Sequence, residues 1–183
     1  HRVVDRGDIT IPAPETQPFS EASAKFLPLI SRACRQLAGQ VEETLDAGAF
    51  PLALGGDHSI AIGTISGIAH HLLKIHGGKA PPKVGIIWFD AHADINMPET
   101  SPSGNIHGMP VSSLLGHGPE ELTAIGFEGP KFPVASFSQI GLRDIDDTEK
   151  RLVKNAAYHH YTMTDIDKRG MRTVMEEAIG FTA

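Results

Sequence analysis

An apolar run that ends in alternating acidic and imidazole side chains constrains the fold of this chain most strongly. The run extends from Val84 to Phe89, and Asp90, His92 and Asp94 follow at every second position. A run of this kind is typical of a strand that is buried on both faces, as in a parallel sheet. Open α/β sheets bind ligands at the carboxyl ends of such strands, and burying these donors is costly unless a cation neutralises them. The segment therefore predicts a divalent metal site at one edge of a parallel sheet.

The rest of the chain alternates helix-like and strand-like segments. Apolar residues recur with helical spacing from Phe26 to Leu45, and Gly48 is the expected helix stop. Further segments are expected as strands at 51–54, 138–142 and 159–163, as helices at 59–75 and from Thr164 or Asp165 to Ile179, and as a surface excursion at 116–135. This alternation favours an α/β fold with a mostly parallel sheet. We expect one domain over residues 1–183, and an incomplete one, because another strand should follow the last helix.

Composition excludes several classes of function. The 183 residues suit one domain with a sizeable core, and a net charge of −6 without a basic patch argues against a nucleic-acid partner. No apolar run reaches membrane-spanning length, so we expect no membrane partner. The single cysteine, Cys34, cannot form an intrachain disulfide and lies among apolar residues, which predicts a small buried core residue.

The segment Gly55–Ser59 (GGDHS) offers a second donor beside the first cluster. Taken alone, it has the pattern of a turn followed by a helix cap, with Asp57 or Ser59 as the capping residue. Taken with the strand that ends at Asp90, it places His58 at a neighbouring strand end. Two imidazoles and two carboxylates together suit manganese, iron or zinc better than calcium or magnesium.

Two further polar segments are candidate parts of a binding site. In SGNIHGMP, Ser103 and Asn105 are candidates to bind a polar substrate, and His107 is a candidate proton carrier. The glycines of this segment, at 104 and 108, would let the backbone approach a ligand closely. The alternative interpretation is an ordinary surface turn. In the segment GLRDIDDTE, several acidic residues follow a predicted strand. They could face a ligand, or they could form a solvated loop with a helix cap. These acids are Asp144, Asp146, Asp147 and Glu149.

Taken in order, these four segments resemble the ureohydrolase family and, within it, the arginases. GGDHS together with DAHADIN marks the whole family, whereas SGNIHG and Asn96 favour an arginase over an agmatinase. The resemblance extends from VVDRGD near the start of the chain to VMEEAI near its end. It implies a three-layer α/β/α fold and two manganese ions in each active site.

The resemblance also implies a role for each matching residue. His58 and Asp94 would bind one ion, His92 would bind the other, and Asp90 would bridge the two. His107 would carry a proton. The residues that would hold the substrate are Asn96, Ser103, Asn105, Asp146 and Glu149. The implied reaction is hydrolysis of the guanidinium group of L-arginine by a metal-activated hydroxide, giving L-ornithine and urea.

Four elements of the family pattern are missing from this chain: a later Asp-x-Asp pair of metal ligands, a later glutamate that faces the guanidinium, a C-terminal segment for subunit contact and an N-terminal strand. We therefore expect a truncated domain that is inactive alone. The alternatives are another ureohydrolase, acting on agmatine or guanidinobutyrate, and a non-catalytic fragment that acts only by association. The resemblance further implies a homo-oligomer, a trimer in intact members, and a cytoplasmic location with a mitochondrial one as the alternative.

Overall fold

The computed structural model describes residues 3–13, 16 and 22–183. Within these ranges the helices are α1 (Leu27–Asp46), α2 (Ile60–Ile75), α3 (Pro110–Leu114), α4 (Glu120–Thr123), α5 (Asp147–Asn155), α6 (Met163–Arg169) and α7 (Met171–Thr182). The strands are β1 (Ile86–Phe89), β2 (Phe137–Leu142) and β3 (His159–Thr162), and two 3-10 turns are η2 (Ile106–Gly108) and η3 (Val134–Ser136). None of the helices described has both the length and the apolar character needed to cross a membrane.

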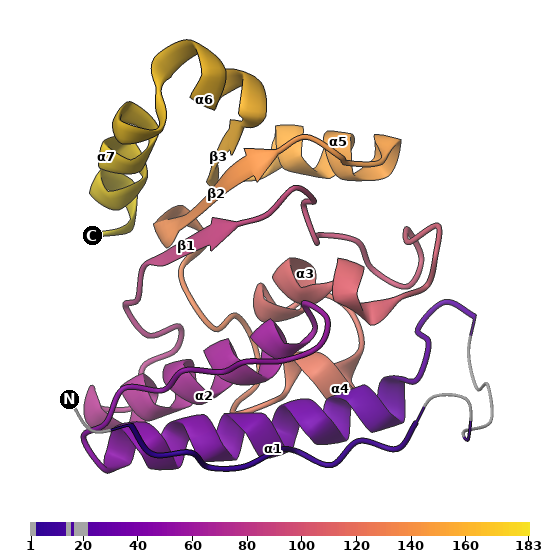
Figure 1. Cartoon of the computed structure of the whole chain (residues 1–183), viewed down its shortest axis with the longest axis vertical. Coiled ribbons are helices and arrows are strands. Elements are labelled where there is room, and N and C mark those ends of the chain that lie inside the picture. The colour runs from indigo at the N-terminus through magenta and orange to yellow at the C-terminus, as the bar shows by residue number, and fades with distance from the viewer. Residues whose placement is uncertain (1–2, 14–15, 17–21) are drawn as a thin grey trace.

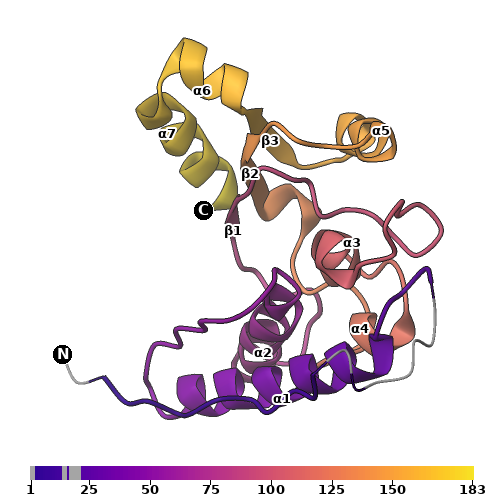
Figure 2. The same ribbon diagram turned by 45° about the vertical axis from the view of Figure 1, so that its right-hand side comes forward.

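The three strands form one parallel sheet in the order β1-β2-β3. Ile86 of β1 lies opposite Phe137 of β2, and Ser138 of β2 lies opposite His159 of β3. Helices α6 and α7 contact one side of the sheet, and helices α1 to α4 lie on its other side (Figure 1, Figure 2). This layered arrangement around parallel strands confirms the predicted α/β fold class.

Side chains alternate between the two faces of the sheet, and each face has its own apolar cluster. Trp88, Phe137 and Tyr158 pack with side chains of α2 and α3. Ile140 and Tyr161 pack on the opposite face against α7. All six residues of β2 are buried, because this central strand is covered on both faces and paired along both edges.

Helices α1 and α2 pack closely because two glycines of α2 have no side chain at the contact. A Cβ atom at Gly63 would lie 2.6 Å from the carbonyl oxygen of Cys34, and one at Gly67 would lie 2.4 Å from that of Ala38. Cys34, Ala38 and Val41 form the buried stripe of α1. The predicted helix and the predicted core position of Cys34 are therefore both confirmed.

The predicted strand at residues 51–54 is wrong. This segment belongs to no strand of the described residues, and Leu52 and Leu54 are 79% and 86% exposed. A strand needs a neighbouring strand to pair with its backbone N–H and C=O groups. The apolar composition of residues 51–54 does not provide such a neighbour. The expectation that the strand before Asp90 is buried on both faces is also wrong at its end, where Phe89 is 57% exposed.

The predicted C-terminal helix is interrupted. Gly170, with a φ angle of 80°, separates α6 from α7, a backbone conformation that glycine adopts at little cost. Helix α6 also begins earlier than predicted. Its cap is Thr162, whose side chain accepts a hydrogen bond from the backbone N–H of Asp165, while the Asp165 carboxylate accepts one from the N–H of Thr162.

The segment 116–135 is not the surface excursion that its glycines and prolines indicate. Leu122, Ile125 and Phe132 are each at most 2% exposed, and they belong to the core. Lys131 is fully buried as well, and its Nζ donates hydrogen bonds to three backbone carbonyl groups of this segment. A charged residue in the core has no sequence signal of its own, because lysine is normally exposed.

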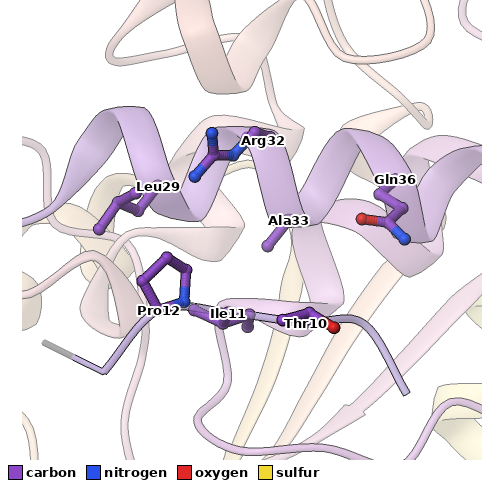
Figure 3. Close-up of a pocket in the computed structure, with 7 residues that line it drawn as sticks. All are labelled: Thr10, Ile11, Pro12, Leu29, Arg32, Ala33 and Gln36. Carbon is purple, nitrogen blue, oxygen red and sulfur yellow. The ribbon is translucent and has the colours of Figure 1, made fainter.

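The N-terminal segment lies along α1 and leaves a small hollow between the two (Figure 3). The hollow is lined by Thr10, Ile11, Pro12, Leu29, Arg32, Ala33 and Gln36. None of the residues predicted to act in the site lines it, so it is not the predicted site.

Candidate metal centre

Donors from two separate segments meet at the carboxyl end of β1. His58 lies in the turn before α2, and Asp90 directly follows β1. The Nδ1 atom of His58 lies 2.6 Å from Oδ2 of Asp90 and 2.7 Å from Oδ2 of Asp94. One donor atom from each of the three residues lies within 4.8 Å of the others. The structure therefore brings together three of the four predicted metal ligands, and their role as ligands stays a prediction.

The loop that carries these acids is held in place by hydrogen bonds. Oδ1 of Asp90 accepts a hydrogen bond of 2.8 Å from the backbone N–H of His92. From β2, Nε2 of Gln139 donates to the carbonyl groups of His92 and Ala93, each at 3.0 Å. Asp94 has a φ angle of 52°, a left-handed conformation that is unfavourable for most residues other than glycine. The hydrogen bonds from Gln139 of β2 thus hold the loop in the conformation that turns the Asp90 and Asp94 carboxylates toward His58.

The acids and the imidazole change one another's pKa. The Asp94 carboxylate, with a smaller effect from Asp90, raises the pKa of His58, although burial of the ring opposes the change. Burial raises the pKa of Asp94, the charge of Asp90 adds to this, and His58 opposes it. The His58 ring also lies on Trp88, with 4.4 Å between ring centroids. Because metal ligands must be deprotonated, a cation bound here would replace the proton of His58.

The donor set fits a transition-metal ion. Oδ2 of Asp94 is buried and has no hydrogen-bond partner among the described residues, because Nδ1 of His58 approaches it without hydrogen-bond geometry. A buried carboxylate oxygen without a hydrogen bond is costly, and a cation would satisfy it. One imidazole nitrogen with two carboxylates suits manganese, iron or zinc better than calcium or magnesium.

His92 lies beside this group without belonging to it. Its Nδ1 atom is 3.2 Å from Oδ1 of Asp90, and its Nε2 atom is 3.5 Å from Oδ2 of Asp144. The side chain is 56% exposed. Asp90 therefore has His58 at one carboxylate oxygen and His92 at the other, an arrangement in which one carboxylate contacts both imidazoles.

Three of the residues predicted to bind substrate form one hydrogen-bonded network. Nδ2 of Asn96 donates to Oδ2 of Asp146 at 2.8 Å. Asp146 is the N-cap of α5 and forms a capping box with Glu149. Burial alone would raise the pKa of Asp146, but hydrogen bonds from the Glu149 N–H and from Asn96 lower it. Burial raises the pKa of Glu149 itself. The helix-cap interpretation of these two acids is therefore correct, and the hydrogen bond from Asn96 also links the cap to the loop that carries Asp90 and Asp94.

Ser103 and Asn105 lie in the loop before η2. Oγ of Ser103 accepts a hydrogen bond of 3.2 Å from the backbone N–H of Asn105, and the Ser103 side chain is exposed. The expected approach of a ligand to Gly104 stays a prediction, and the structure gives this glycine a packing role. A Cβ there would lie 1.8 Å from the carbonyl oxygen of Ala22, so this glycine makes room for the chain itself. At Gly108 nothing lies within 4 Å of such an atom.

His107, the predicted proton carrier, contacts a residue that the sequence indicated only as a helix cap. Its Nδ1 atom lies 3.5 Å from Oδ2 of Asp57. The cap of α2 is Ser59, and its side chain makes no capping hydrogen bond. Instead, Oδ1 of Asp57 accepts a hydrogen bond of 3.0 Å from the backbone N–H of Ser59. Asp57 thus connects the turn that carries His58 with His107.

Sequence reasoning missed three residues that support the site: Trp88, Gln139 and Asp57. Trp88 and Gln139 lie at interior positions of strands, and in the sequence they stand within largely apolar runs that indicate only a buried strand. A buried glutamine in a strand is a signal that can be found, because a buried amide needs hydrogen-bond partners. No comparable signal distinguishes Asp57 from an ordinary capping residue.

Fold and site together define an α/β protein with a candidate metal centre at the carboxyl end of its sheet. The sequence model of the Arginase family matches residues 1–183, and the chain belongs to this family. Among curated relatives, the chain is 46% identical to an arginase from Brevibacillus brevis and 42% identical to one from Bacillus caldovelox. These matches cover 97% and 98% of this chain but only 56% and 57% of the two relatives.

Solved structures agree with this assignment. The crystal structure of an arginase from Bacillus cereus is 39% identical, with a TM-score of 0.84, and the match covers 97% of this chain and 56% of that one. The arginase of Entamoeba histolytica, solved in complex with L-ornithine, is 34% identical with a TM-score of 0.77, over 88% of this chain and 52% of that one. The chain therefore spans about half the length of the relatives that it matches.

Proposed function

We propose that this chain is part of a dimanganese arginase, which hydrolyses L-arginine to L-ornithine and urea. The observation that carries the proposal is the convergence of His58, Asp90 and Asp94, whose donor atoms lie close enough together to hold a metal ion. Membership of the Arginase family and the relatives named arginase support the choice of reaction. The ornithine in the E. histolytica structure is the product that this reaction would release.

In this proposal, His58 and Asp94 would hold one ion, His92 would hold the other, and Asp90 would provide a ligand to both. The contacts of Asp90 with both imidazoles support its bridging role. When bound, the two cations supply a water nucleophile near neutral pH by lowering its pKa. Manganese is proposed from the family resemblance, because the donor set alone suits iron and zinc equally well.

The other residues bind the substrate and move a proton. Asn96, Ser103 and Asn105 would hold the α-carboxylate of arginine, and Asp146 would hold its α-amino group. Glu149 would belong to the same group of substrate-binding residues. The hydrogen-bonded network of Asn96 and Asp146 supports a shared role, because it fixes both side chains. His107 would give a proton to the amine that leaves as the guanidinium C–N bond breaks.

The test is urea release by a full-length protein that contains this chain, with arginine and agmatine as competing substrates. Contacts to the α-carboxylate should favour arginine by at least about a hundredfold in kcat/KM, since agmatine lacks that group and leaves its partners unpaired. A preference for agmatine or guanidinobutyrate would instead identify another ureohydrolase. No urea from any of these substrates would favour a non-catalytic role by association.

The 183-residue chain alone gives a second test. The proposal assigns it four protein ligands, fewer than two ions need, so we expect at most one weakly bound manganese ion and no measurable urea release. Robust urea release from this chain would contradict the proposal.

Association with further copies and a cytoplasmic location complete the proposal, with a mitochondrial location as the alternative. The exposed side chains of Phe50, Leu52 and Leu54, which lie within five consecutive residues, support association, because large exposed apolar side chains favour contacts with other chains. Replacing both Leu52 and Leu54 by serine should lower the mass measured by light scattering at a given protein concentration. An unchanged mass would exclude this surface as the contact.

A further inference from the structure

The Asp57 carboxylate lies between two groups that fix its position. Its Oδ1 atom accepts hydrogen bonds from both the backbone N–H and the hydroxyl group of Ser59. Its Oδ2 atom lies 3.5 Å from Nδ1 of His107. One carboxylate oxygen is therefore anchored at the start of α2, and the other is turned toward the candidate proton carrier.

The same apolar cluster holds both sides of this contact. Ile62, in the first turn of α2, packs in one cluster with Ile106 and Met109, the residues on either side of the His107–Gly108 pair. All three are at most 1% exposed. On the α2 side, Sγ of Cys34 also donates to the carbonyl group of Ser59 at 3.4 Å. Because well-packed cores deform little, the separation between Asp57 and His107 is set by the fold.

We infer that Asp57 is a positioning residue that keeps the proton of neutral His107 on Nδ1 and leaves Nε2 as the nitrogen that exchanges protons. A neutral imidazole carries one proton, and the partner of one ring nitrogen determines which nitrogen holds it. A carboxylate only accepts hydrogen bonds, so its approach to Nδ1 favours the Nδ1–H form. The distance of 3.5 Å is long for a hydrogen bond, so the preference is electrostatic and moderate.

This inference rests on the proposed function for its consequence in the reaction. The imidazolium form of His107 would give its Nε2 proton to the departing amine nitrogen as the guanidinium C–N bond breaks. The ring would then be neutral, with its remaining proton on Nδ1 facing Asp57. Without the carboxylate, part of the neutral population would hold its proton on Nε2 and would no longer accept one there.

The test measures the tautomer directly on the 183-residue chain, with neither metal nor substrate. Two-bond ¹H–¹⁵N correlation spectra of the chain with ¹⁵N-labelled histidine distinguish Nδ1–H rings from Nε2–H rings. The signals of His107 are those that disappear in the His107→Asn variant. In the wild type at a pH where the ring is neutral, Nδ1–H should predominate. Because both side chains are about half exposed, at 48% and 51%, Asp57→Asn should lower the ratio of Nδ1–H to Nε2–H by about two- to fivefold.

Asp167→Asn is the matched control, since it makes the same chemical change at an exposed residue of α6, and it should leave the ratio unchanged. If Asp57→Asn fails to fold, Ser59→Ala serves instead, because it removes the hydroxyl anchor of Asp57 and should shift the ratio in the same direction. A wild-type ring that carries its proton on Nε2, or a ratio that no variant changes, would overturn the inference. Either result leaves the urea assay untouched, so failure here and failure of the proposed function are distinguishable.

Discussion

Nδ1 of His58 lies 2.6 Å from Oδ2 of Asp90, although the two residues belong to different segments of the chain. The contact forms because the turn before α2 and the end of β1 meet at the same edge of the sheet. Only Asp90 follows a strand there, and the carboxyl ends of parallel strands are the usual place for ligand sites in α/β folds. The candidate metal centre is thus a consequence of the topology, and its surroundings allow several quantitative tests.

The packing of α1 against α2 predicts opposite effects for two glycine-to-alanine changes. Gly67→Ala should lower the free energy of unfolding by about 2 kcal/mol, because the new Cβ would lie 2.4 Å from the Ala38 carbonyl oxygen and backbone atoms cannot move aside easily. Gly39→Ala is the matched control in α1, where nothing lies within 4 Å of the new atom. It should raise the free energy of unfolding by about 0.5–1 kcal/mol through helix propensity. Urea denaturation of the two variants checks both signs, and a stabilising Gly67→Ala would contradict the packing described.

Lys131 should stabilise the segment between α4 and β2. Its Nζ donates to the carbonyl oxygens of Thr123 at 2.7 Å, of Gly129 at 3.0 Å, and of Phe127. Burial lowers the pKa of Lys131 to about 8, so the side chain is still charged at neutral pH.

Replacing Lys131 by methionine should therefore lower the free energy of unfolding by about 2–4 kcal/mol, because three buried carbonyl groups lose their donor. The exposed Lys79→Met change should stay within about 0.5 kcal/mol of the wild type. An equally stable Lys131→Met variant would show that the cost of burying the charge cancels these hydrogen bonds.

Cys34 should make stability depend on pH in the alkaline range. Burial raises the pKa of the Cys34 thiol from 9.0 to about 11. A thiol that deprotonates more readily in the unfolded chain contributes stability below pH 9, and this contribution is lost as the pH rises toward 11. The difference in free energy of unfolding between wild type and Cys34→Ala should therefore fall by up to about 1.4 kcal/mol per pH unit in this window. A difference that stays constant from pH 8 to pH 10.5 would contradict the burial of the thiol.

The sequence predicted the candidate metal ligands around β1 better than it predicted residues 51–54 and the C-terminal helices. Asp90 and Asp94 follow an apolar run whose period and length are local signals, and His58 follows two glycines that mark a turn. Their predicted convergence is confirmed, although its premise holds only for Asp90 and Asp94, because residues 51–54 before His58 form no strand.

Features that depend on non-local pairing were not predictable from local sequence. Residues 51–54 have the composition of a strand, yet strand formation depends on a partner that composition does not reveal. A glycine inside a helix lowers helix stability by only about 1 kcal/mol relative to alanine, so helices tolerate it. The presence of Gly170 alone therefore does not identify the break between α6 and α7. The burial of Lys131 and the contact of Asp57 with His107 depend on how distant segments pack.

The most direct test of the candidate metal centre is a manganese titration of the 183-residue chain, followed by the electron paramagnetic resonance signal of free Mn²⁺. The wild type should bind one ion weakly, and Asp90→Asn should weaken this binding by about tenfold or more, since it removes a charged ligand but keeps an oxygen that can accept the His92 N–H. Asp167→Asn should bind as the wild type does. Equal affinity in wild type and Asp90→Asn, or no binding by the wild type at millimolar Mn²⁺, would contradict the assignment of His58, Asp90 and Asp94 as metal ligands.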